Sequence, residues 1–135
     1  KLEQALICGD LSVPDLPGAW NDAFESSFGT RPPDDLQGCL QDIHWYDGAF
    51  GYFPTYTLGA LAAAQLFSTA IKDHPDMLTQ ISKGNFCTLL DWLRKNVHSI
   101  GSALSTEEIL IKVTGSSLST TSFLLHLNNR YLGEA

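Results

Sequence analysis

The sequence has few basic residues, few cysteines and no long hydrophobic run, and each shortage excludes a class of protein. Eight Lys and Arg residues stand against fifteen Asp and Glu, which gives a formal net charge of −7. Nucleic acids and anionic membranes are bound by clustered positive charge, so we expect neither as a partner. The most apolar run, LGALAAAQLF at 58–67, is too short to span a bilayer.

The three cysteines are Cys8, Cys39 and Cys87, which are far apart and form no C-x-x-C pair. This spacing supports neither a disulfide framework nor a zinc ribbon. Three thiols without a recognisable signal peptide are typical of a reducing compartment, so we predict a cytoplasmic protein. Ordinary packed or partly exposed free cysteines are the favoured interpretation.

Motifs for metal binding and for covalent catalysis are also missing. The sequence has no H-E-x-x-H, no G-x-S-x-G and no glycine-rich phosphate loop. A zinc site needs three or four ligands, often two from one helix. The four histidines instead fall on separate expected elements, at His44, His74, His98 and His126. We therefore expect no metal ligands and no covalent nucleophile in this chain.

What is present is a helical pattern along most of the chain. A length of 135 residues with 44% hydrophobic residues suits one domain with a real core. No strand pattern competes with the helical spacing, so the sequence predicts an all-α fold. Ser105 and Glu108 form a capping box, and Asn85 is a good N-cap. The expected helices are 1–8, 16–28 ended by Gly29, 54 to about 73, 74–83 ended by Gly84, 85–100, 105–114 ended by Gly115, and a last one that carries Phe123, Leu124, Leu127 and Tyr131 on one side.

The first residues lie within a helical pattern of Leu2, Leu6 and Cys8, with no N-cap residue or initiator Met before it. Natural helices usually begin at a capping residue. We therefore expect the chain to be the C-terminal piece of a longer protein.

The segment 38–56, GCLQDIHWYDGAFGYFPTY, has more hydrogen-bonding and aromatic side chains than a connector needs. Asp42 and His44 are two residues apart, so they would not face each other on a helix. In an extended loop both can point into a cleft, where Asp fixes the tautomer of His and His donates to a substrate. One such pair is not specific by itself.

Two tyrosines in this segment allow two interpretations. If Tyr52 belongs to the start of the helix, Tyr52 and Tyr56 lie on one stripe above Gly59 and Ala63. A phenol can donate a hydrogen bond to a developing oxyanion without adding charge. Aromatic stripes are more often the edge of a core, and spacing alone favours that interpretation.

Five residues of the segment match a known signature. Gly38, Gln41, Asp42, His44 and Trp45 fit the pattern G-x-x-Q-D-x-H-W of the carboxypeptidase Taq family of zinc metallocarboxypeptidases, which the chain resembles. The resemblance covers essentially the whole chain. Further stretches resemble that family in the same order, namely GDL at 9–11, FGYFPTYTLG at 50–59, KGNF at 83–86, LLDWLR at 89–94 and VTG at 113–115.

The resemblance implies an almost wholly helical fold, similar to neurolysin and angiotensin-converting enzyme, with two halves that flank a deep active-site groove. It implies release of C-terminal residues from peptides. Residues 1–135 would be the C-terminal segment of the catalytic domain and would form the groove wall opposite the zinc helix. The ligands of zinc or another divalent metal, and an arginine for the substrate carboxylate, would precede Lys1. The expected partners are a peptide substrate, the N-terminal part of the same protein and a second copy in a homodimer, and the chain alone would be inactive.

The resemblance also implies roles for single residues. In neurolysin-like enzymes a G-Y-x-x-x-Y segment hydrogen-bonds the tetrahedral intermediate, and Gly51, Tyr52 and Tyr56 fit it, which reverses the interpretation from spacing alone. His44 would be a second donor, held by Asp42 or Gln41. The implied roles are catalysis by Tyr52 and His44, substrate binding by Gln41, Asp42 and Tyr56, and loop packing by Trp45.

Two other functions stay open on the residues alone. One is a helical interaction module without catalysis, and the other is a helical domain that binds a small molecule through its tyrosine and histidine cluster. An H-E-x-x-H motif in the preceding coding sequence would favour the peptidase.

Overall fold

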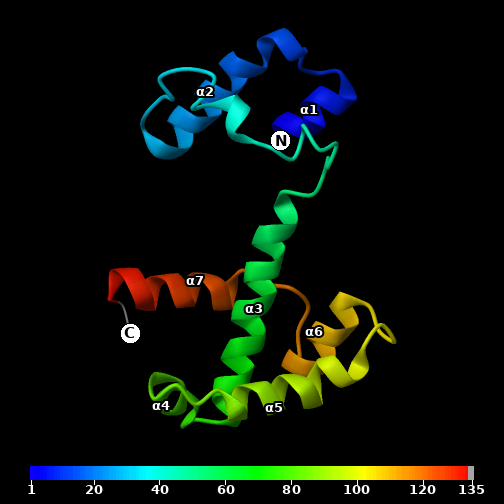
Figure 1. Cartoon of the computed structure of the whole chain (residues 1–135), viewed down its shortest axis with the longest axis vertical. Coiled ribbons are helices and arrows are strands. Elements are labelled where there is room, and N and C mark those ends of the chain that lie inside the picture. The colour runs from blue at the N-terminus through cyan, green and yellow to red at the C-terminus, as the bar shows by residue number, and fades with distance from the viewer. Residues whose placement is uncertain (134–135) are drawn as a thin grey trace. The chain divides into compact units, whose positions relative to one another are not determined.

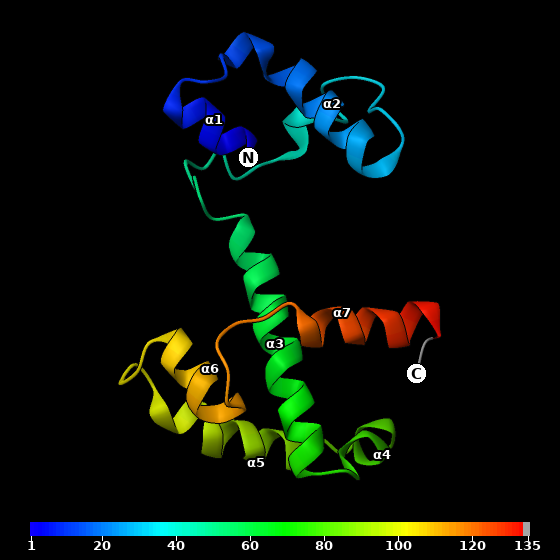
Figure 2. The same ribbon diagram turned by 180° about the vertical axis from the view of Figure 1, so that it is seen from behind.

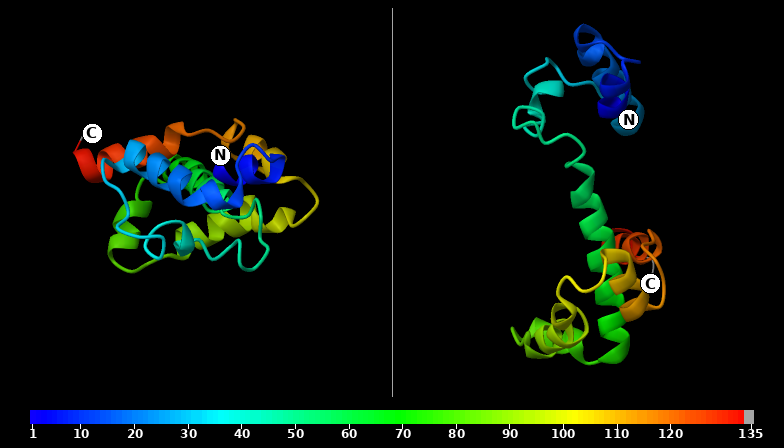
Figure 3. Two further views of the ribbon diagram at one scale, coloured as in Figure 1. Left: turned by 90° about the horizontal axis from the view of Figure 1, so that it is seen from above. Right: turned by 90° about the vertical axis from the view of Figure 1, so that its right-hand side faces the viewer.

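The computed structural model describes residues 1–133, and within that range the chain contains helices, turns and loops but no strand (Figure 1, Figure 2 and Figure 3). The all-α prediction is confirmed. Three short 3₁₀ helices, at Val13–Asp15, Cys39–Gln41 and His98–Ile100, and a π-helix at Asn128–Leu132 accompany the α-helices. The α-helices are α1 Leu2–Cys8, α2 Leu16–Phe28, α3 Pro54–Asp73, α4 Met77–Ser82, α5 Cys87–Asn96, α6 Thr106–Thr114 and α7 Thr121–Leu127.

The chain divides into two compact units, one of residues 1–55 and one that begins at Tyr56. The first unit contains α1, α2 and the long loop that follows α2. The second contains most of α3 and all later helices. No helix within residues 1–133 is both long enough and apolar enough to cross a membrane.

The second unit has a core built from three successive helices. Ala70 of α3, Met77 of α4 and Trp92 of α5 form one buried cluster. The indole Nε1 of Trp92 donates to Asp73 Oδ2 at 2.8 Å, so the polar atom of this buried ring has an acceptor. Around the cluster pack the partly buried residues Leu66, Phe67, Ile71, Ile81, Leu89, Leu93, Val97 and Val113.

A buried amide fixes the connection between α6 and α7 to α3. Gln65 is only 4% exposed. Its Nε2 lies 2.8 Å from Thr114 Oγ1 and 3.0 Å from Ser116 Oγ, and its Oε1 accepts the backbone N–H of Ser119 at 3.1 Å. A buried amide with satisfied donors and acceptors specifies one arrangement of the loop around it.

Several helix ends follow the sequence prediction. At α6, the Ser105 hydroxyl accepts from the Glu108 N–H at 3.3 Å, and the Glu108 carboxylate accepts from the Ser105 N–H at 2.8 Å, which confirms the capping box. Gly29 ends α2 with φ +73° and Gly115 ends α6 with φ +83°, a backbone region that glycine tolerates best.

Three helices differ from the expected bounds, and the first is α4, which begins at Met77 and not at His74. α5 begins at Cys87 and not directly after Asn85, whose Oδ1 nevertheless accepts the Cys87 N–H at 3.1 Å. It ends at Asn96 because Val97, at φ −120° and ψ −61°, leaves the helical region and packs against the buried cluster. The last helix changes at Leu127 from α to π, so Tyr131 does not continue one α-helical face.

Candidate functional site

The loop after α2 begins with contacts back to that helix. Arg31 Nε donates to Glu25 Oε2 at 2.7 Å, and a second guanidinium nitrogen pairs with Asp22. The hydrogen bond to Glu25, assisted by both carboxylates, raises the pKa of the Arg31 guanidinium above its ordinary value. Gly38 is buried, and a Cβ there would lie 3.0 Å from the Asp34 carbonyl oxygen. The first position of the signature therefore requires glycine for a close backbone approach.

Trp45 attaches the loop to α2. Its ring meets Trp20 edge to face, with ring centroids 6.4 Å apart and an angle of 86° between the planes. The indole nitrogens of both rings are buried and have no hydrogen-bond partner among residues 1–133. The contact is an aromatic packing contact, which agrees with the packing role expected for Trp45.

Asp42 and His44 are brought together as the sequence predicted for an extended segment. Asp42 has φ −80° and ψ 102°. Its Oδ1 lies 2.8 Å from His44 Nδ1 and accepts the His44 backbone N–H at 3.0 Å. The His44 and Asp42 side chains are 16% and 11% exposed. An ionised carboxylate can only accept, so Nδ1 carries the proton and Nε2 is directed away from Asp42.

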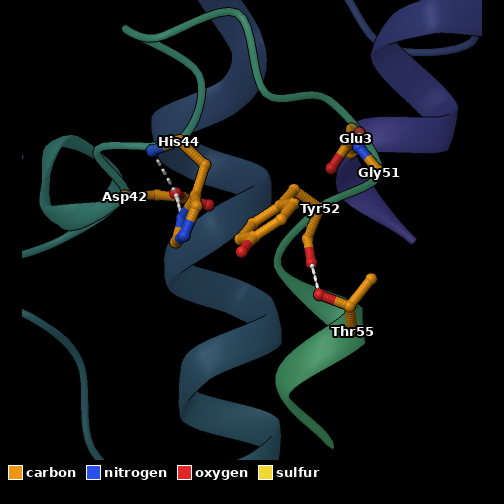
Figure 4. A network of polar contacts seen from close by, with 6 residues as sticks. All are labelled: Glu3, Asp42, His44, Gly51, Tyr52 and Thr55. Atoms are coloured by element: carbon orange, nitrogen blue, oxygen red, sulfur yellow. Dashed lines mark hydrogen bonds and ion pairs between the residues drawn. The ribbon is translucent and has the colours of Figure 1, made fainter. Parts of the chain in front are cut away.

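Tyr52 lies beside this pair, in the turn before α3 (Figure 4). The ring centroids of His44 and Tyr52 are 5.8 Å apart, with an angle of 31° between the planes, and Phe53 meets His44 at 4.7 Å. The Tyr52 carbonyl accepts the Thr55 N–H at 2.9 Å and the Thr55 hydroxyl at 2.6 Å. Tyr52, His44 and Asp42 thus form one cluster within the first unit.

The condition for a stripe of two tyrosines on one helix face is not met, because the helix begins at Pro54, as the sequence predicted. α3 begins at Pro54, and Gly51 at φ +77° breaks any helical path before it, so Tyr52 lies outside the helix. Tyr56 lies in α3, belongs to the second unit and is 59% exposed.

Gln41 uses its amide inside the loop. It ends the 3₁₀ helix Cys39–Gln41, and its Nε2 donates to the Leu36 carbonyl. Of the two residues that the sequence offered to hold His44, Asp42 makes the contact.

Nothing in the sequence marked Glu3, which also reaches this region. Glu3 lies in α1, and its Oε1 accepts the backbone N–H of Gly51, the residue before Tyr52. A single acidic residue in a short helix carries no pattern, and the contact joins positions 48 residues apart. Only the folded chain reveals it.

Within residues 1–133, no three His, Cys, Asp or Glu side chains are close enough to hold a metal ion. The Nδ1 of His44 is already engaged by Asp42. The cluster is therefore a set of hydrogen-bonding groups, with an imidazole, a carboxylate and a phenol.

Comparison with known proteins identifies relatives along the whole described chain. It is 41% identical over 131 residues to thermostable carboxypeptidase 1 of Thermus thermophilus, and 39% identical over 132 residues to thermostable carboxypeptidase 1 of Pyrococcus furiosus. These matches cover 97% and 98% of this chain but 26% of each relative, so the chain spans about a quarter of their length.

A solved structure supports the same relationship. Trypanosoma cruzi metallocarboxypeptidase 1 superposes with a TM-score of 0.90 at 36% identity, over 97% of this chain and 28% of that one. The family described as carboxypeptidase Taq (M32) metallopeptidase matches residues 1–131. The resemblance that the signature at 38–45 predicted is confirmed, and the chain belongs to the carboxypeptidase Taq (M32) metallopeptidase family.

Proposed function

We propose that residues 1–135 are the C-terminal segment of a carboxypeptidase catalytic domain, and that they form one wall of the groove in which C-terminal amino acids are released from peptides. The relatives that support this proposal are carboxypeptidases of which the chain matches 26%. The observation that carries it is the Asp42–His44 pair, with its 2.8 Å contact, beside the phenol of Tyr52. These are the groups needed to hold and polarise a peptide bond.

His44 acts through the ring nitrogen that Asp42 leaves available. In the neutral ring Nε2 accepts a hydrogen bond, for example from a peptide N–H. In the protonated ring Nε2 donates to a carbonyl oxygen. In either form Asp42 orients the ring through its contact with Nδ1.

Tyr52 donates to the carbonyl oxygen as negative charge develops on it. A neutral phenol gains little from the ground state and more from the charged intermediate, so its effect belongs to the transition state. Gln41, Asp42 and Tyr56 are the residues that we assign to substrate binding. Tyr56 lies one turn into the helix that follows Tyr52, so its effect on turnover is the smaller of the two phenols.

The family is one of metallopeptidases, which implies a divalent metal in the full-length enzyme. The described residues of this chain do not fit such an ion, because they bring no ligand set together. We assign the ligands of zinc, or of another divalent metal, to the N-terminal part of the protein, and we expect the chain alone to be inactive. Elemental analysis of the purified chain tests this assignment, and one tightly bound zinc ion per molecule would contradict it.

The N-terminal part of the same protein is the proposed partner, in a cytoplasmic enzyme that forms a homodimer. Large apolar side chains of the first unit support this partner, since unpaired apolar surface favours association. We expect the chain alone to bind a hydrophobic dye or to self-associate. A monomer with cooperative unfolding and no dye binding would argue against it. The exposed apolar residues of this unit include Ile7, Phe28, Leu36, Ile43 and Phe50.

Tyr52→Phe in the full-length enzyme tests the proposed chemistry, because it deletes one oxygen and little packing. Loss of one oxyanion donor lowers kcat by about 10²–10³, whereas KM should change far less. The measurement is steady-state kinetics on a blocked dipeptide, beside a thermal melt. Near wild-type kcat, or loss of activity only in step with Tm, would show that Tyr52 has no catalytic role.

A further inference from the structure

The turn that carries Tyr52 is held from outside by one carboxylate. Glu3 of α1 accepts a hydrogen bond from the backbone N–H of Gly51, directly before Tyr52 (Figure 4). A carboxylate acceptor makes this bond about twice as strong as a neutral one. It joins the first helix of the unit to the turn that precedes α3.

The two glycines of this turn contribute no side-chain packing of their own. Gly48 and Gly51 have φ of +69° and +77°, and a Cβ at either position would meet no atom within 4 Å. Inside the loop, Tyr52 N–H donates to the Ala49 carbonyl at a long 3.3 Å. Glycine gives the backbone more conformational freedom than other residues do, so a hydrogen bond from a neighbouring helix helps to fix the conformation at Gly51.

A hollow of about 390 Å³ lies between α1 and the turn. Glu3, Ile7 and Cys8 line it from the helix, and Phe50 and Gly51 line it from the turn. The Glu3 carboxylate reaches the Gly51 N–H across this incompletely filled space. Where side chains do not interlock, few contacts set the backbone position.

We propose that Glu3 is a positioning residue for Tyr52, an inference that rests on the proposed function of that phenol. By holding the Gly51 peptide, Glu3 keeps the Tyr52 ring beside His44, with centroids 5.8 Å apart. Catalytic groups lose much of their effect when they move by about 1 Å. This role does not require Glu3 to contact the substrate.

The test compares Glu3→Ala with Glu3→Gln in the full-length enzyme. Glu3→Ala removes the acceptor, and we expect kcat to fall by about 10- to 100-fold with KM nearly unchanged. Glu3→Gln retains an accepting oxygen and should recover most of that loss. Gln4→Ala is the matched control, since Gln4 is exposed on the same helix and lines the same hollow. Thermal melts of all three variants report on folding.

A double-mutant cycle separates positioning from stability. If Glu3 acts through the phenol, Glu3→Ala should lower kcat only slightly in an enzyme that already carries Tyr52→Phe, because the effects of coupled residues on kcat do not add. Three outcomes would each overturn the inference. The effects of Glu3→Ala and Tyr52→Phe on kcat could be fully additive. Glu3→Gln could lower kcat as much as Glu3→Ala does, or Glu3→Ala could lower kcat no more than Gln4→Ala does. If Tyr52→Phe lowers kcat and Glu3→Ala does not, this inference alone is overturned. If Tyr52→Phe leaves kcat unchanged, the proposed role of Tyr52 is overturned, and this inference is overturned with it.

Discussion

The two units of the chain differ in how they are held together. In residues 1–55 the buried residues are Gly38 and Cys39, while the candidate site consists of half-buried and exposed side chains. In the unit that begins at Tyr56, three helices contribute to one buried cluster around Met77 and Trp92. The first unit is organised by hydrogen bonds and glycine turns, and the second by apolar packing.

This difference predicts that turnover and stability can be separated by mutation. Hydrogen-bonding groups such as Asp42 and His44 stay accessible to a ligand because the loop that carries them is not packed from all sides. Buried apolar groups such as Met77 contribute to stability in proportion to the surface removed from water. Substitutions in the candidate site should change kcat, and substitutions in the buried cluster around Met77 should change the free energy of unfolding.

The largest effect is expected for His44→Ala in the full-length enzyme. It removes the ring that Asp42 orients, and we expect kcat to fall further than the roughly 10²–10³ typical of one lost oxyanion donor. KM also changes if the imidazole touches the substrate. Asp42→Asn is the graded control, because the amide oxygen can still accept from Nδ1 but carries no charge. A His44→Ala enzyme more active than Tyr52→Phe would contradict this ranking.

Met77→Ala should give the largest loss of stability. Met77 has no exposed surface, and removing such a side chain costs about 2–5 kcal/mol. The matched control is Leu78→Ala in the same helix, because Leu78 is 53% exposed and should cost far less. Urea unfolding of the chain measures both. A Met77→Ala enzyme that is fully folded but has a much lower kcat would break the separation between the units.

Tyr56→Phe should have a smaller effect on turnover than Tyr52→Phe. Tyr56 lies in the second unit, and the loss of one hydrogen bond to a substrate costs about 1 kcal/mol, or roughly fivefold. Steady-state kinetics of the two variants under the same conditions provide the comparison. Equal effects would mean that both phenols share one role in the transition state.

The smallest effect is expected at the capping box of α6. The Ser105 hydroxyl, and then its backbone N–H, donate to the Glu108 carboxylate and lower its pKa below the ordinary 4.5. Because the folded value is the lower one, this stabilisation is present above pH 4.5 and is lost as the pH falls through the folded pKa. Ser105→Ala should cost about 1 kcal/mol near neutral pH and somewhat less in acid, because the bond from the Glu108 N–H to the Ser105 hydroxyl does not depend on pH.

Ser102→Ala, an exposed serine outside the helix, is the control for that experiment. Thermal melts from neutral to acidic pH measure the difference. A Ser105→Ala penalty that is independent of pH would show that Glu108 contributes nothing to the cap.

Much of the fold could be predicted because it depends on neighbours in the sequence. Helix ends at Gly29 and Gly115, the capping box at Ser105 and the Asp42–His44 contact all join residues at most four apart. The start of α3 at Pro54 was predicted from the proline, which suits the first turn of a helix. Spacing alone could not decide whether Tyr52 belongs to that helix, because Tyr52 fits the helical period but lies in a glycine turn. Periodicity shows which face a side chain would take if the helix continued, and not where it stops.

By itself the sequence determined that the chain is helical, which family signature it carries and that Asp42 and His44 can meet in an extended loop. Only the tertiary structure decided that Val97 leaves its helix to join the core, that Gln65 fixes the loop between α6 and α7, and that Glu3 reaches Gly51. The first group depends on local backbone geometry and on short hydrogen bonds. The second depends on contacts between residues far apart in the sequence, for which no local pattern exists, because the partner is set by how the helices pack.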